Sequence, residues 1–276
     1  RAKGVASFTL VSSLPSVFCP YIGGFLMTRF GTLPGLRIAY FVSGLLGVIG
    51  VSYRAVRLEE TYAGNGVTRE GRLRDIILDT VNSYVEAAKQ MSSGARRLLA
   101  YSLTASAGSG MTASYASLYV IETLQVQAQF YGLLTNMAGI VNIIFLFAST
   151  ALVKRAGLRK TAIYASLSVP VGQFIFVRSK GMNDLATWTV LGAAGSAFLG
   201  PSIAALQADL TPKEARGRLM ALFSFFPLVL AIPAQILGGY LYENVNPLAP
   251  FLASLPIFVL AAAILVGIKE PESVSG

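Results

Sequence analysis

Hydrophobic residues in this chain fall in long blocks rather than in the short or alternating patterns of a soluble fold. Eight stretches contain no charged residue: 4–28, 38–53, 98–121, 123–153, 161–177, 185–208, 219–242 and 244–268. A helix needs roughly 17–25 apolar residues to cross the hydrocarbon of a bilayer. Seven stretches reach that length, and 38–53 reaches it when the uncharged residues before Arg37 are included. The pattern predicts eight transmembrane helices, because a soluble protein built from them would have almost no polar surface.

Composition agrees with a membrane protein and excludes several kinds of chemistry. Hydrophobic residues make up 54% of the chain and charged residues 13%, whereas a soluble domain carries about 25% charged residues. The 276 residues include one cysteine, Cys19, and no histidine. Disulfides, zinc sites and cysteine–histidine catalysis within the chain are therefore excluded. No predicted span pairs a nucleophile with a base, so we expect neither an enzyme nor a cofactor.

The distribution of basic residues predicts the orientation. All but four of the 22 lysines and arginines fall in loops on one side of the predicted spans, and the four exceptions are Arg29, Arg37, Arg178 and Lys180. Basic residues concentrate in cytoplasmic loops, which places both ends of the chain in the cytoplasm. Basic residues in cytoplasmic loops account for the net charge of +9. We therefore expect the chain to interact with the lipid bilayer and not with nucleic acid.

Residues 54–97 are the one long segment outside the predicted spans. Between residues 74 and 91, apolar side chains recur at helical spacing, at Ile77, Val81, Tyr84, Val85 and Ala88. This spacing predicts an amphipathic cytoplasmic helix that lies on the lipid headgroups or on the protein itself. A docking site for a regulatory partner is the alternative.

The first two predicted spans are similar to the last two. Residues 1–8 align with residues 216–223, and the same offset places Gly23 and Gly24 on Gly238 and Gly239. Six spans separate the two copies, which is the repeat unit of a known class of transporters. We therefore expect four further spans before Arg1. The chain then divides into three parts. Residues 1–53 are the last two spans of a first six-helix bundle, residues 54–97 are the linker, and residues 98–276 are the second bundle.

A loop between two spans carries the first family resemblance. Residues 151–160, Ala-Leu-Val-Lys-Arg-Ala-Gly-Leu-Arg-Lys, resemble the signature G-x-L-x-D-R-x-G-R-K of the major facilitator superfamily. Leu152, Arg155 and Gly157 match, and Lys154 stands where the family prefers aspartate. A carboxylate at this position can lie at the N-terminus of a neighbouring helix, where the helix dipole stabilises negative charge. Lysine cannot make this interaction. The departure weakens the mechanism that the signature implies more than it weakens the resemblance.

Two further matches extend the resemblance over essentially the whole chain. The loop at residues 209–218 is similar to an inter-span corner of the family, which implies a cytoplasmic gating cluster of Arg155, Asp209 and Arg216. Ordinary positive-inside charge explains the arginines equally well. Pro20, Gly23 and Gly24 resemble the end of the family's antiporter motif G-x-x-x-G-P-x-x-G-G. The alternative is that Pro20 kinks the helix and the glycines allow close packing.

Uncharged polar residues are the candidates for substrate contact. No ionisable residue lies at mid-membrane depth, because Glu122, Asp184, Asp209 and Glu243 all stand at span ends. Any H+ or Na+ coupling is therefore expected through the missing N-terminal half, and the alternative is a facilitator without ion coupling. From the spans that line the cavity in the resembled fold and from their neighbours, we expect Ser109, Tyr115, Asn136 and Asn142 to contact substrate. Hydrogen bonding between helices is the alternative for each, since an unpaired amide in hydrocarbon is costly.

The resemblance implies an all-α polytopic membrane protein, a bundle like that of the major facilitator superfamily with eight of twelve spans present. We expect alternating-access transport of a small solute across the plasma membrane. The apolar lining favours efflux of amphipathic or drug-like compounds. The alternative is a membrane sensor or scaffold on the same fold that transports nothing.

Overall fold

Helices account for nearly all of the structure. The computed structural model describes residues 18–57, 84, 86, 88, 89, 91–212 and 215–268, without the side chains of residues 150, 151 and 154. Residues 18–30 are helical. The other elements are α2 (Thr32–Arg57), α4 (Ser93–Leu118), a π-helical turn η1 (Tyr119–Thr123), α5 (Ala128–Ala156), α6 (Leu158–Arg178), α7 (Met182–Asp209), α8 (Arg216–Asn244) and α9 (Ala249–Val266). The all-α fold class is confirmed.

Six helices in the described part of the chain are long and apolar enough to cross a membrane: α2, α6, α7, α8, α9 and residues Ala128–Ser149 of α5. The predicted span 4–28 lies partly outside the described residues. The predicted span 98–121 corresponds to α4, which has 26 residues but is not among the six. Serine, threonine and glycine lower its mean hydropathy, and its residues 98–118 form an uncharged helical stretch.

Helix α4 tolerates a polar composition because two helices pack closely against it. It packs against α8 on one side and α9 on the other. A Cβ at Gly110 would come within 2.8 Å of the Ala231 carbonyl oxygen of α8, and a Cβ at Gly108 within 2.8 Å of the Phe258 ring of α9. Gly238 of α8 lies in turn against the backbone of Met111. Small residues let helices approach this closely in a membrane, where dispersion and hydrogen bonds replace the hydrophobic effect between helices.

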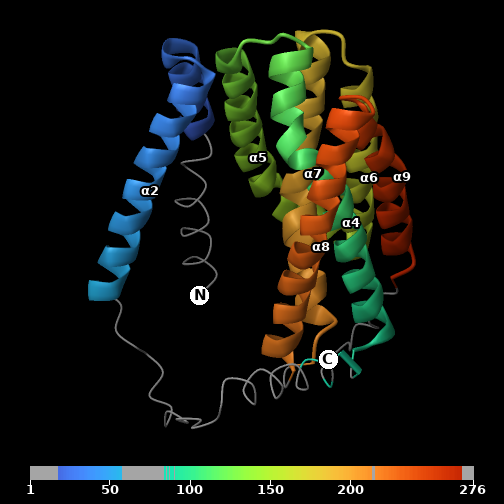
Figure 1. Ribbon diagram of the computed structural model, residues 1–276. Coiled ribbons are helices and arrows are strands. Elements are labelled where there is room, and N and C mark those ends of the chain that lie inside the picture. The colour runs from blue at the N-terminus through green and yellow to red at the C-terminus, as the bar shows by residue number, and fades with distance from the viewer. Residues whose placement is uncertain are drawn as a thin grey trace.

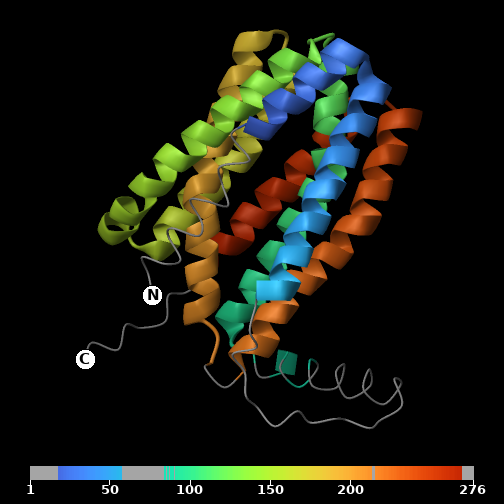
Figure 2. The ribbon, with the colours of Figure 1, turned by 90° about the vertical axis from the view of Figure 1, so that its left-hand side faces the viewer.

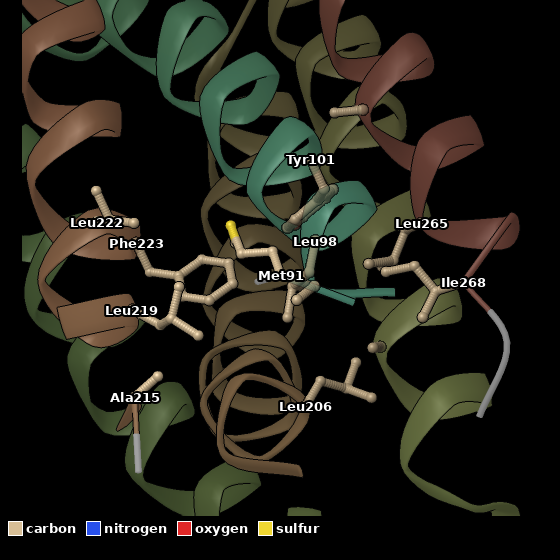
Figure 3. Close-up of a cluster of buried hydrophobic side chains, with 13 residues drawn as sticks. Met91, Leu98, Tyr101, Leu206, Ala215, Leu219, Leu222, Phe223, Leu265 and Ile268 are labelled. Atoms are coloured by element: carbon tan, nitrogen blue, oxygen red, sulfur yellow. The ribbon is translucent and has the colours of Figure 1, made fainter. Parts of the chain in front are cut away.

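A cluster of buried side chains, the inner core, lies at the end of the bundle where α4 begins (Figure 3). Leu98 and Tyr101 of α4 meet Leu206 of α7, Leu219 of α8 and Leu265 of α9, among others. Tyr84 and Ala88 also pack against this cluster, and they are two members of the predicted apolar face of the linker. The other members, Ile77, Val81 and Val85, lie outside the described residues. The linker therefore packs, at these two residues, on the protein itself.

A second cluster, the outer aromatic core, lies at the opposite end of the bundle. The rings of Tyr119, Phe176 and Phe251 contact one another with centroids 4.8–5.5 Å apart, and Trp188 adds a contact of 4.5 Å to Phe176. These rings come from η1, α6, α9 and α7. Aromatic pairs at these distances add to the stabilisation from burial alone, so the outer core ties four elements together.

The helix at residues 18–30 and α2 stand outside this bundle (Figure 1). Helix α2 makes no extensive contact with any helix from α4 to α9, and Gly35 is its one buried residue. The 18–30 helix lies beside the start of α5 in both views (Figures 1 and 2). The described structure thus consists of a six-helix body, α4–α9, and a helix pair attached to it through α5.

Replacing Gly238 by alanine tests the close α4–α8 approach. The added methyl group meets the backbone of Met111, which cannot turn aside as a side chain can. We expect the free energy of unfolding to fall by about 1–3 kcal/mol, measured by thermal or denaturant unfolding of the purified protein. The matched control is Gly47→Ala in α2, where a Cβ would meet no atom within 4 Å. That change should leave stability unaltered or raise it by up to about 1 kcal/mol, as alanine does in a helix. Equal effects of the two changes would contradict the packing.

Candidate functional site

The contact between the 18–30 helix and α5 is built on two glycines. A Cβ at Gly24 would come within 2.6 Å of the Ala128 carbonyl oxygen, and a Cβ at Gly132 within 2.6 Å of the Pro20 carbonyl oxygen. The two helices run antiparallel, so each glycine accepts the backbone of the other helix. Gly23, in contrast, would place a Cβ in open space. Of the residues predicted for packing, Gly24 and Pro20 therefore lie in this contact and Gly23 does not.

Beside these glycines lies an open pocket of about 400 Å³, lined by Tyr21, Gln129, Phe130, Leu133 and Asn136. The Asn136 side-chain oxygen accepts a hydrogen bond from the Tyr21 backbone N–H at 3.1 Å. The Gln129 amide donates to the Tyr21 hydroxyl, also at 3.1 Å. The sequence predicted Asn136 as a substrate contact, with a hydrogen bond between helices as the alternative, and missed Tyr21 and Gln129. A glutamine in the first turn of an uncharged span was the available signal.

Asn142 lies further along α5 and faces α7. Its amide donates to the Ala193 carbonyl oxygen at 3.1 Å and to the Ser196 hydroxyl at 2.9 Å. Ser196 belongs to an exposed stripe on α7 that also contains Gly192 and Gly200. A Cβ at either glycine would meet no atom within 4 Å. Asn142 thus fixes α7 to α5 at the edge of a smooth, small-residue surface.

Tyr115 joins α4 to α8. Its hydroxyl donates to the Gln235 carbonyl oxygen at 3.0 Å, and its ring stacks on Tyr242 with centroids 5.5 Å apart. The Gln235 amide returns a hydrogen bond to the Ser114 hydroxyl at 2.8 Å. These contacts satisfy polar groups that would be costly in hydrocarbon.

Ser109 is exposed and lines a separate small cavity between α4, α6, α7 and α9. The four predicted substrate residues therefore do not converge on one point. Three of them, Tyr115, Asn136 and Asn142, make hydrogen bonds between helices, which was the alternative role. A substrate role for each stays a prediction.

The predicted gating cluster is only partly assembled. The Arg216 guanidinium donates to the Ala208 carbonyl oxygen at 3.0 Å, at the C-terminal end of α7, where the helix dipole favours a positive charge. Asp209 is the last residue of α7 and is exposed, as is Arg155. Within the described part of the chain, no ion pair joins these three residues.

Two other arginines hold a helix end. The guanidinium of Arg97 in α4 donates to the Gly267 carbonyl oxygen, and that of Arg159 in α6 donates to the Val266 carbonyl oxygen at 2.7 Å. The last carbonyls of a helix have no partner within the helix, so these arginines cap α9. Sequence reasoning missed this arrangement, because nothing in the sequence brings 97, 159 and 267 together.

Acidic side chains are spread along the described residues rather than grouped. Nowhere among them do three His, Cys, Asp or Glu residues come together in a way that would hold a metal ion. Asp184, at the start of α7, accepts a hydrogen bond from the Lys180 backbone N–H at 3.0 Å. The site is thus made of hydroxyl, amide and backbone groups on apolar helices.

A comparison with families of known proteins gives one match, to the model described as the Major Facilitator Superfamily. The match covers residues 1–182 and, in a second alignment, residues 98–275. Residues 98–182 are covered by both alignments. No curated protein matches the chain.

Cysteine cross-linking tests the contact between the 18–30 helix and α5. In a Cys19→Ser background, the pair Tyr21→Cys and Asn136→Cys should form a disulfide on mild oxidation, because the Tyr21 N–H and the Asn136 side chain are in hydrogen-bond contact and disulfides need Cα atoms about 4.4–6.8 Å apart. Adding Gly132→Leu should abolish the cross-link, since the side chain would displace Pro20. The control pair, Gly47→Cys with Asn136→Cys, should stay reduced. A cross-link that forms equally with leucine at position 132 would contradict the contact.

Proposed function

This chain belongs to the major facilitator superfamily, and on that premise we propose that it moves a small, uncharged or amphipathic solute by alternating access. Membership makes it a transmembrane solute carrier rather than an enzyme. The observation that carries the finer proposal is the way in which two helix groups meet. In the described residues, a six-helix body and a helix pair meet at a glycine-permitted contact, and alternating access proceeds by the rocking of one bundle against another.

The proposed division of the chain follows from this contact. Residues 1–53 supply the last two helices of a first bundle, 54–97 connect the bundles, and 98–276 form the second bundle. Support comes from the extensive packing within α4–α9 and from its absence around α2, where Phe41, Leu46 and Ile49 are all exposed. A glycine contact without interlocking large side chains suits a moving interface, because few packed side chains must separate.

The proposed pathway runs along α7 and the adjoining polar residues. A helix face in contact with lipid exposes large apolar side chains, as α2 does. The α7 stripe of Gly192, Ser196 and Gly200 exposes almost none. Such a face suits close passage of a solute, with Asn142 and Ser196 offering hydrogen bonds at its edge. Asn136, Tyr115 and Ser109 are the further proposed contacts.

The chemistry of these residues supports a neutral or amphipathic substrate. Hydroxyl and amide groups hydrogen-bond a neutral solute but do not compensate a full charge in low dielectric. The resemblance to the family's antiporter motif, at Pro20, Gly23 and Gly24, favours efflux. Coupling to H+ or Na+ is proposed through carboxylates outside 1–276, since no acidic residue falls at the middle of a predicted span. The plasma membrane, with both ends cytoplasmic, is the proposed location.

Gating is proposed at the cytoplasmic end. Arg216 already lies against the end of α7 next to Asp209. A small rearrangement of the loop after α7 would let Asp209 pair with Arg216 or Arg155 in one of the two access states. The pair would be broken in the other state, so its formation would bias the equilibrium between them.

Flux measured with the full-length protein tests the function. Inverted membrane vesicles that contain the protein should accumulate the amphipathic dye Hoechst 33342 faster than vesicles without it, and should not accumulate labelled glucose. Uptake of glucose alone would overturn the amphipathic preference. Binding of a solute without any flux would favour the sensor or scaffold.

A bulky residue on the α7 stripe tests the pathway. Gly200→Leu should fold normally, because a Cβ there meets no atom within 4 Å. It should lower the initial flux by about tenfold, because a solute must pass the side chain during the access change. The control is Ala263→Leu, at an exposed position of α9, which should leave flux near that of the parent. Unchanged flux for Gly200→Leu would place this stripe against lipid.

A further inference from the structure

A small cavity lies inside the six-helix body, apart from the contact between α5 and the 18–30 helix. Its volume is about 100 Å³. Tyr101, Ala105 and Ser109 of α4 line one side, and the rest of the lining is Ser166, Val169, Leu199, Phe258, Ala261 and Ala262 from α6, α7 and α9. The cavity adjoins the inner core, where Tyr101 is the uppermost labelled side chain in Figure 3.

The Tyr101 hydroxyl distinguishes this cavity from an ordinary packing gap. Tyr101 is 6% exposed, yet its hydroxyl makes no hydrogen bond to any residue within the described ranges. Buried tyrosine hydroxyls normally have a partner, and this oxygen keeps some accessible surface, since it is not among the fully buried side-chain atoms that lack a partner. A group occupying the cavity would supply that partner.

The other polar groups of the lining are compatible with the same occupant. Ser166 is 3% exposed and donates to the Ile163 carbonyl oxygen at 2.8 Å, so its oxygen remains free to accept. Ser109 is exposed and also lines the cavity, which makes it the residue at the entrance. The wall between these hydroxyls consists of alanine, valine, leucine and phenylalanine.

The lining limits what can bind. No charged side chain contributes to it, so a charged molecule would remain uncompensated in a low-dielectric site. A cavity of about 150 Å³ holds one benzene molecule, so the smaller volume here suits about four heavy atoms. One hydrogen-bonding atom would face Tyr101, and an apolar remainder would face Phe258 and Leu199.

We infer that this cavity is a binding site for a small uncharged amphiphile, of the size and chemistry of a short alcohol. The site lies behind α4 and α7, between them and α6 and α9, whereas the proposed pathway follows the exposed stripe of α7. Ser109, at the entrance, is the one residue of the lining that is also a proposed substrate contact.

Saturation-transfer NMR with 1-propanol, on the full-length protein in nanodiscs, measures the binding directly. Ala262→Leu fills the cavity and should remove the protein-dependent signal. Tyr101→Phe removes the hydroxyl and should weaken binding by about fivefold, as expected for one hydrogen bond. The control Ala194→Leu, on the outer surface of α7, should bind as the parent does, and propylammonium should give no signal. Equal 1-propanol signals from the parent and Ala262→Leu would overturn the proposal, and would leave the transport proposal untouched.

Cysteine reactivity provides a second measurement that does not depend on filling the core. In a Cys19→Ala background, Ala262→Cys should react with the small neutral reagent methyl methanethiosulfonate and resist its trimethylammonium-ethyl analogue. Adding 1-propanol should slow the reaction. Leu98→Cys is the control, because Leu98 is 0% exposed and does not line the cavity. If Ala262→Cys were as unreactive as Leu98→Cys, or if 1-propanol had no effect on it, the site would be excluded.

Discussion

Close packing of α4 against its two neighbours organises this protein. Helices in a bilayer gain nothing from leaving water together, so they associate through dispersion and hydrogen bonds at short range. Gly108 and Gly110 bring α4 against α9 and α8, and Gly238 does the same from the α8 side. The outer aromatic core and the inner core then lock the two ends of the bundle. If α4 did not lie this close to α8, Tyr115 of α4 would not reach Gln235 of α8. Helices α8 and α9 would also lose α4 as their common packing partner.

Polar side chains serve this assembly in a consistent way. Gln173 of α6 donates to Ser254 of α9 at 3.1 Å, Asn142 joins α5 to α7, and Gln235 joins α8 to α4. Each amide finds its partner on another helix, because an amide facing lipid would have none. The interior of the body is therefore held by specific hydrogen bonds, and few uncharged polar groups remain free for a solute. The Tyr101 hydroxyl is one that has no hydrogen-bond partner within the described ranges, whereas Ser196 of the α7 stripe donates to the Ala193 carbonyl oxygen at 2.9 Å.

The helix pair of residues 18–57 differs from this body in kind. Its large apolar side chains point outward, and its one close contact with the body is the glycine pair Gly24 and Gly132. An interface of this type resists sliding and tilting less than an interlocked core does. That difference between a locked body and a lightly held pair is the physical basis of the proposed rocking motion.

The positions of the helices were determined by the sequence alone, because only a block of apolar residues can cross a bilayer and charges must fall at its ends. The family resemblance, read from residues such as Arg155 and Gly157, agrees with the family match. The roles of individual polar residues depended on tertiary structure. Asn136, Asn142 and Tyr115 occur in the sequence as equivalent polar residues in spans, and only the arrangement of the helices gives each a different partner. The same holds for two glycines of α7, since Gly195 lies against Ser168 of α6 whereas Gly192 faces open space. A periodic pattern reports that a residue lies on a helix, whereas the neighbour that it meets depends on how that helix is rotated and tilted against the others.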